Sequence, residues 1–133
     1  MTSMATFKIK CDNFPILEGE EDEIINPNTY GKALALYLQD NLIKHGYAVP
    51  FICCEDSGWW IEIKTNVKIF GLMCVRDETG ENLFYCNLVK PDSKAWIWRK
   101  FKFDDLSDIK SKIIHDVHSI FSSDPKIEIL DFH

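Results

Sequence analysis

Apolar residues recur at every fourth position in one stretch of the chain, and this spacing predicts an amphipathic helix. The apolar stripe is formed by Tyr30, Leu34, Leu38 and Leu42. Asn26 and Pro27 predict the start of this helix, because asparagine caps free N–H groups and proline suits the first turn. His45 and Gly46 predict its end, since glycine readily adopts the left-handed conformation that closes a helix.

A second helix is predicted near the end of the chain. Its apolar face has the same spacing and consists of Leu106, Ile109, Ile113, Val117 and Ile120. Asp104 or Asp105 is the expected cap, and the polar segment Ser122–Pro125 is the expected end.

Strand-like runs fill most of the remaining chain. They are expected at Ala5–Cys11, Val49–Cys54, Trp59–Lys64, Val67–Arg76, Leu83–Val89 and Ile127–Phe132, and Ala95–Phe103 is a further extended segment. Val67–Arg76 is apolar on both faces, which is typical of a central strand, and Ile127–Phe132 is expected at an edge. The order of elements, β-α-β-β-β-β-α-β, predicts an α+β fold. In it, a mainly antiparallel sheet of about five to seven strands carries two helices on one face.

Composition indicates one domain, residues 1–133. The chain has 133 residues, of which 46% are hydrophobic, enough for one core and too few for two. Met1–Phe7 lacks the basic region and apolar run of a signal peptide. The five cysteines are an odd number without a CxxC pair, which favours unpaired thiols in a reducing compartment. We therefore expect a cytoplasmic protein.

Charge narrows the choice of partner. The formal net charge is -6, which disfavours direct binding to nucleic acid or to an anionic membrane. Residues 1–66 hold ten acidic and five basic residues, whereas residues 67–133 hold eleven and ten. The negative charge is therefore concentrated in the first half.

One acidic run dominates that half. It consists of Glu18, Glu20, Glu21, Asp22 and Glu23. Five neighbouring carboxylates repel one another, so the run is either a solvated, flexible loop or a surface that meets a basic partner. Pro15–Leu17 is a possible anchor that would present the charges, and Glu55 and Asp56, expected in a turn, are possible additions to the surface.

Tryptophans are the second candidate contact. In the alternating segment Trp59–Lys64, one residue of the pair Trp59 and Trp60 should enter the core and the other should leave it. If Trp60, Trp96 and Trp98 share the outer face of the sheet, they form an aromatic patch of the kind that anchors protein interfaces. Alternatively, a helix covers them and they belong to the core.

Catalytic chemistry has little support. No phosphate-binding glycine loop, nucleophile elbow or zinc-protease motif occurs, and no catalytic residue, metal or cofactor is expected. Cys53, Cys54, His115 and His118 are the residues that a small enzyme or ligand-binding module would use. His115 and His118 lack the two further ligands that a metal requires nearby.

Several short motifs between residues 14 and 60 carry a resemblance. They are Phe14-Pro15, Asn26-Pro27, Tyr30-Gly31, Leu34-Ala35, Gly46 and the turn Glu55-Asp56-Ser57-Gly58-Trp59. The segment resembles a family of small uncharacterised bacterial proteins with an N-P-x-x-Y-G-x-x-L-A helix start and an E-D-x-G-W turn. Ser57 stands where an aromatic residue is common in that turn. The resemblance implies a bacterial origin and a compact α+β fold, and it implies no activity.

These observations favour a small acidic interaction protein, not an enzyme. We expect a bacterial immunity or inhibitor protein that occludes the basic cleft of a toxin, such as a nuclease. A phage-encoded inhibitor that mimics nucleic acid would have the same features. A ligand-binding module or small enzyme with a site between sheet and helix is also open, as is a homo-oligomer joined through its tryptophan face.

Overall fold

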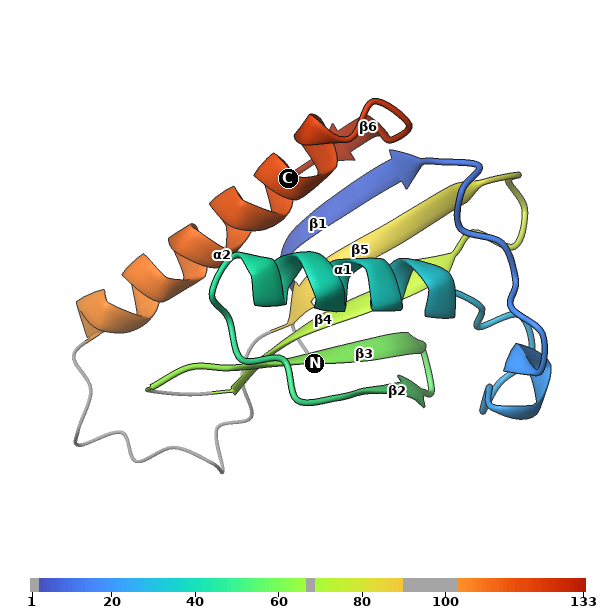
Figure 1. The fold of residues 1–133 in the computed structure, drawn as a ribbon, viewed down its shortest axis with the longest axis horizontal. Helices are drawn as coiled ribbons and strands as arrows, with labels where there is room; N and C mark the ends of the chain where they lie inside the picture. Colours follow the sequence, from blue (N-terminus) through green and yellow to red (C-terminus); the bar gives the residue numbers. More distant parts are fainter. Residues whose placement is uncertain (1–2, 67–68, 90–102) are drawn as a thin grey trace.

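One six-stranded antiparallel sheet carries both α-helices on the same face (Figure 1). The computed structural model describes residues 3–66, 69–89 and 103–133. The strands are β1 (Ser3–Lys10), β2 (Ile52–Glu55), β3 (Gly58–Lys64), β4 (Ile69–Arg76), β5 (Leu83–Val89) and β6 (Glu128–Phe132). The helices are α1 (Lys32–Lys44) and α2 (Phe103–Ser123), with a short 3₁₀ helix at Glu20–Asp22. The predicted α+β fold is confirmed.

The strand order is β2-β3-β4-β5-β1-β6. Strands β2 to β5 form a meander, and β1 then pairs with β5 on one side and β6 on the other. The connection through α1 therefore carries the chain from β1 to the opposite edge of the sheet. As predicted, β4 is an inner strand and β6 is an edge strand.

Side-chain alternation directs one face of each inner strand against the helices. From β3 these core residues are Trp59, Ile61 and Ile63, and from β4 they are Phe70, Leu72 and Cys74. They meet the stripe of α1, in which Leu34, Leu38 and Leu42 are fully buried. Burying such a side chain contributes roughly 1.5–3 kcal/mol, so this layer supplies a substantial part of the driving force for folding.

The start of α1 differs from the prediction. The helix begins at Lys32, six residues after Asn26, so Asn26 is too far upstream to cap it; its side-chain Nδ2 donates to the backbone oxygen of Asp56. Gly31 occupies the N-cap position without a capping side chain of its own. The polar partner of these first N–H groups comes from another segment, described below.

Two other predicted segments are shifted. Strand β2 begins at Ile52 and not at Val49, because Pro50 has no N–H to add to a ladder. The expected extended segment Ala95–Phe103 lies outside the described residues except for its last residue, which begins α2. Helix α2 ends at Ser123, as expected.

Two tyrosine–aspartate pairs connect the helical layer. The Tyr37 hydroxyl donates to Asp124 at 3.0 Å, and the Tyr47 hydroxyl donates to Asp116 at 2.5 Å. Lys112 also donates to Asp116, at 3.0 Å. Burial alone would raise the pKa of Asp116, but the hydrogen bonds from Tyr47 and Lys112 outweigh it and hold that pKa below its usual value. Burial, together with the bond to Asp116, raises the pKa of Tyr47 to about 12.

Candidate functional site

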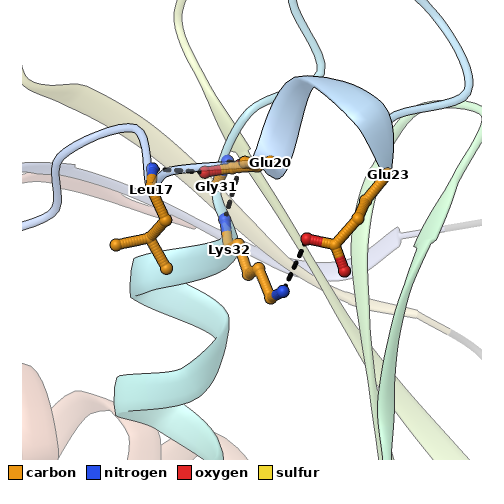
Figure 2. A network of polar contacts seen from close by, with 5 residues as sticks. All are labelled: Leu17, Glu20, Glu23, Gly31 and Lys32. Atoms are coloured by element: carbon orange, nitrogen blue, oxygen red, sulfur yellow. Dashed lines mark hydrogen bonds and ion pairs between the residues drawn. The ribbon is translucent and has the colours of Figure 1, made fainter.

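Glu20, the second residue of the acidic run, is fully buried and holds three backbone N–H groups (Figure 2). Its Oε1 accepts from Leu17 at 3.0 Å. Its Oε2 accepts from Gly31 at 2.9 Å and from Lys32 at 3.0 Å, at the first turn of α1. A carboxylate is favourable there because N–H groups without a helical partner point at it and the helix dipole is positive at this end.

The expectation that Glu20 contacts a partner is therefore wrong, because its side chain has no exposed surface. The other four members of the run, Glu18, Glu21, Asp22 and Glu23, are exposed. These four residues lie on a loop that Glu20 connects to α1 through its hydrogen bonds. Glu23 adds a second connection, an ion pair with Lys32 at 2.6 Å. Phe14 is buried at the base of this loop, while Pro15 and Ile16 of the predicted anchor are exposed.

The turn between β2 and β3 lies beside this loop. Asn26 Nδ2 donates to the backbone oxygen of Asp56 at 2.7 Å, and Thr29 Oγ1 lies 3.8 Å from Cys54 Sγ. These contacts bring the exposed side chains of Glu55 and Asp56 to the same end of the molecule as the acidic run. The two acidic segments are more than thirty residues apart in sequence and become neighbours only through these polar contacts.

A third acidic segment at this end was not predicted. The loop between β4 and β5 exposes Glu78 and Glu81, and the Arg76 N–H donates to Tyr30 oxygen at 2.7 Å, next to α1. The same loop holds Asp77, whose pKa is lowered by hydrogen bonds from Thr79. In the sequence, this loop has only the composition of a hairpin turn. The strand register places it beside Gly58 and hence beside the β2–β3 turn.

We call this surface the acidic end. It comprises the eight exposed carboxylates Glu18, Glu21, Asp22, Glu23, Glu55, Asp56, Glu78 and Glu81. All three loops lie at the same end of the sheet, on the right in Figure 1. Among the described residues of these segments, the cations are Lys32, which is paired with Glu23, and Arg76. The surface therefore presents a concentrated negative potential.

The tryptophan pair divides as predicted. Trp59 points into the core and is 2% exposed, whereas Trp60 lies on the opposite face of the sheet, half-buried. The Trp60 ring covers Gly71 so closely that a Cβ there would lie 1.9 Å from it. Trp96 and Trp98 fall outside the described residues, so a shared aromatic patch stays a prediction.

A groove of about 580 Å³ lies between α1 and β2, next to the acidic end. It is lined by Glu23, Ile25, Lys32, Leu36, Ile52, Cys53, Cys54 and Trp59. The Lys32 ammonium group lies 5.5 Å from the centre of the Trp59 ring. Sequence periodicity contains no signal for this groove, because Leu36 lies off the apolar stripe of α1 and Ile25 lies in the loop before the helix.

The cysteines and histidines do not form a common site. Cys53 and Cys54 lie on β2 at one edge of the sheet, while His115 and His118 are exposed on α2, which packs beside β6 at the other edge. Within the described ranges, no three histidine, cysteine or carboxylate side chains gather as metal ligands. Burial, and then a hydrogen bond to Glu55, raises the pKa of Cys53 to about 11, which disfavours the thiolate.

Comparison with known proteins finds no relative. No family model matches the chain, and neither the curated proteins nor the solved structures contain a significant match. In the part of the chain that the structure describes, neither helix combines the length and the apolar character needed to cross a bilayer.

Proposed function

We propose that this protein is an inhibitor that neutralises a basic protein by covering its positive cleft with the acidic end. The observation that carries the proposal is the convergence of three loops, far apart in sequence, on one surface with eight exposed carboxylates. Like charges held this close repel one another, so a partner that neutralises them gains binding energy. The buried carboxylate of Glu20 supports the proposal, because it ties the principal loop to α1 and so presents the charges.

The partner that best fits this chemistry is an enzyme that binds nucleic acid. Its cleft would be lined with lysine and arginine at phosphate spacing, and the carboxylates would occupy the positions of phosphates. A cytoplasmic immunity protein of a bacterial toxin, such as a nuclease, is the form of inhibitor that we favour. A phage-encoded mimic of nucleic acid would use the same surface against a host protein.

Matched charge variants test the proposal. In the first variant, Glu21, Asp22 and Asp56 at the acidic end are changed to lysine. In the control, Asp108, Glu128 and Asp131, which are exposed on α2 and β6, are changed to lysine. Each substitution adds two positive charges, so both variants move from a net charge of -6 to zero. Glu20 is left unchanged because its loss would disturb the fold.

Both variants and the wild type serve as bait in a lysate of the native host, and the retained protein is then purified. We expect wild type and control to bind one basic protein that the acidic-end variant loses, with an affinity that falls as salt rises. Inhibition of that protein's activity by wild type and control completes the test. Equal binding by all three baits would refute the proposal, because the acidic end would then contribute nothing.

A further inference from the structure

The groove between α1 and β2 has apolar walls that remain open to solvent. Leu36 of α1 is 41% exposed and Ile25, in the preceding loop, is 57% exposed. Ile52 and Cys54 on the other side pack against the core through part of their surfaces. Exposed apolar side chains are common singly, but here two of them border one concave space of about 580 Å³.

The edge of the sheet is open along the same groove. β2 is the outermost strand and pairs only with β3 among the described strands. The Glu62 N–H donates to the Phe51 oxygen, so Phe51 and Glu62 form a hydrogen-bonded pair. In an antiparallel ladder these pairs alternate with pairs that are not bonded. The backbone N–H and C=O groups of Ile52 and Cys54 therefore point away from β3, toward the open side.

A buried donor in the groove wall also lacks an acceptor. Trp59 lines the groove, and its Nε1–H is buried without a hydrogen-bond partner in the described structure. Buried indole N–H groups usually have an acceptor, so this one is an exception that calls for an explanation. A bound segment with a backbone carbonyl oxygen would supply an acceptor for the Trp59 Nε1–H after a small movement of the side chains that line the groove.

Charge around the groove selects the occupant. Glu23 lines it, and Glu55 and Asp56 follow directly at the end of β2. The lining cation, Lys32, is already paired with Glu23 at 2.6 Å. A second copy of this chain would bring another acidic end to a negative rim, so self-association is disfavoured.

We infer that the groove binds an extended segment of the basic partner, in which apolar residues alternate with lysine or arginine. This inference rests on the proposed function and adds a specific contact to it. The segment lies along β2 and exchanges backbone hydrogen bonds with Ile52 and Cys54. Its apolar side chain enters the groove beside Leu36, and its basic side chains lie on the opposite face and reach Glu55, whose carboxylate is on the Cys53 side of β2. The acidic end then supplies attraction and the groove supplies the desolvated anchor.

A defined peptide tests the groove without knowledge of the partner. The probe alternates arginine with leucine over about six residues, with both ends blocked, so that one face is apolar when it is extended. Its counterpart replaces arginine with glutamate. Each is titrated into the full isotope-labelled chain and followed by NMR, in which the indole N–H signal of Trp59 reports on the groove.

We expect the arginine peptide to shift the signals of Trp59, Leu36 and Ile52 in a saturable manner, and the glutamate peptide to leave them unchanged. Leu36→Lys should weaken binding at least about tenfold, since it places a charge in the apolar wall. Ile43→Lys is the matched control: Ile43 is 51% exposed on the same helix but does not line the groove. It should bind as the wild type does.

Each other outcome has a clear meaning. Shifts confined to the acidic loops, unchanged by Leu36→Lys, would overturn the groove inference and leave the proposed function intact. Saturable groove binding, together with equal retention of lysate proteins by the wild type and the Glu21, Asp22 and Asp56 variant, would support the groove while contradicting the proposed function. No shift in the groove, equal binding of the glutamate peptide, or dimerisation of the free chain that Leu36→Lys abolishes would each overturn the inference.

Discussion

The carboxylate of Glu20 lies 3.0 Å from the backbone nitrogen of Lys32, so a side chain twelve residues upstream caps the first turn of α1. The same carboxylate binds Gly31 and Leu17, which joins the acidic loop, the helix and the entry to that loop in one buried contact. An acidic residue within a highly charged run thus has a structural role. The loop is held against the fold through a residue that resembles its solvated neighbours in the sequence.

Replacing Glu20 by alanine should lower the free energy of unfolding by about 2–3 kcal/mol, because three N–H groups, one buried and two partly buried, lose their carboxylate acceptor. Glu21→Ala is the matched control, since Glu21 is exposed and should change stability by less than about 0.5 kcal/mol. Urea unfolding of both variants at neutral pH measures the difference. If the two variants were equally stable, water would satisfy the three N–H groups as well as the Glu20 carboxylate does, and this account of its role would be wrong.

Gly58 should tolerate no side chain. Its φ is +151°, and a Cβ there would lie 2.6 Å from the backbone oxygen of Cys74 on the neighbouring strand. Because backbone atoms of an inner strand cannot move aside cheaply, Gly58→Ala should destabilise the fold by roughly 1–3 kcal/mol. Ser57→Ala, one residue earlier and exposed, should be close to neutral. Thermal unfolding of the two variants checks the ranking, and a neutral Gly58→Ala would contradict this account of the β2–β3 turn.

Tyr47 should ionise only near pH 12 in the folded protein, because burial and its bond to Asp116 raise its pKa to about 12. An unfolded tyrosine ionises near pH 10, so the unfolded state loses its proton first. The contribution of Tyr47 to stability is therefore complete below about pH 10 and is lost as pH rises through about 12. Ultraviolet absorbance titration should show this late step in the wild type and not in Tyr47→Phe. If the step that Tyr47→Phe loses lies near pH 10 and not near 12, the pairing with Asp116 is refuted.

Cys53 should react slowly with thiol reagents. With a pKa of about 11, it holds roughly one thiolate in a thousand molecules at pH 8, against about one in four for a free cysteine. Measured in a Cys54→Ser background, its reaction with an aromatic disulfide should be slower than that of free cysteine by more than about tenfold. Glu55→Gln should speed it several-fold by removing a negative neighbour, whereas Asp56→Asn should not. Fast reaction in the parent protein would instead favour a cysteine-based enzyme.

Periodicity in the sequence was sufficient for most of the fold. The four-residue spacing of Leu34, Leu38 and Leu42 places α1, because a buried helix face requires it. Alternation in Trp59–Lys64 correctly divides the two tryptophans between the faces of the sheet. The predicted start of α1 was wrong because the signal at Asn26 and Pro27 is local, whereas the observed cap is the carboxylate of Glu20, which reaches the helix through a tertiary contact.

The candidate site was only partly predictable. Composition marked Glu18–Glu23 and the pair Glu55 and Asp56, but it could not distinguish the buried Glu20 from its exposed neighbours. It also missed Glu78 and Glu81, whose loop looks like any hairpin turn. The groove beside Leu36 could not be predicted either, because it forms only where α1 packs over β2, and that contact is tertiary.

The sequence by itself determined the order of helices and strands, the apolar core and the negative charge, because these follow from local spacing and composition. Tertiary structure alone decided which carboxylates are presented and which one is used inside the fold. The physical reason is that burial and hydrogen bonding depend on contacts between distant segments, such as Glu20 with Lys32 and Asn26 with Asp56. No pattern of neighbouring residues encodes those pairs.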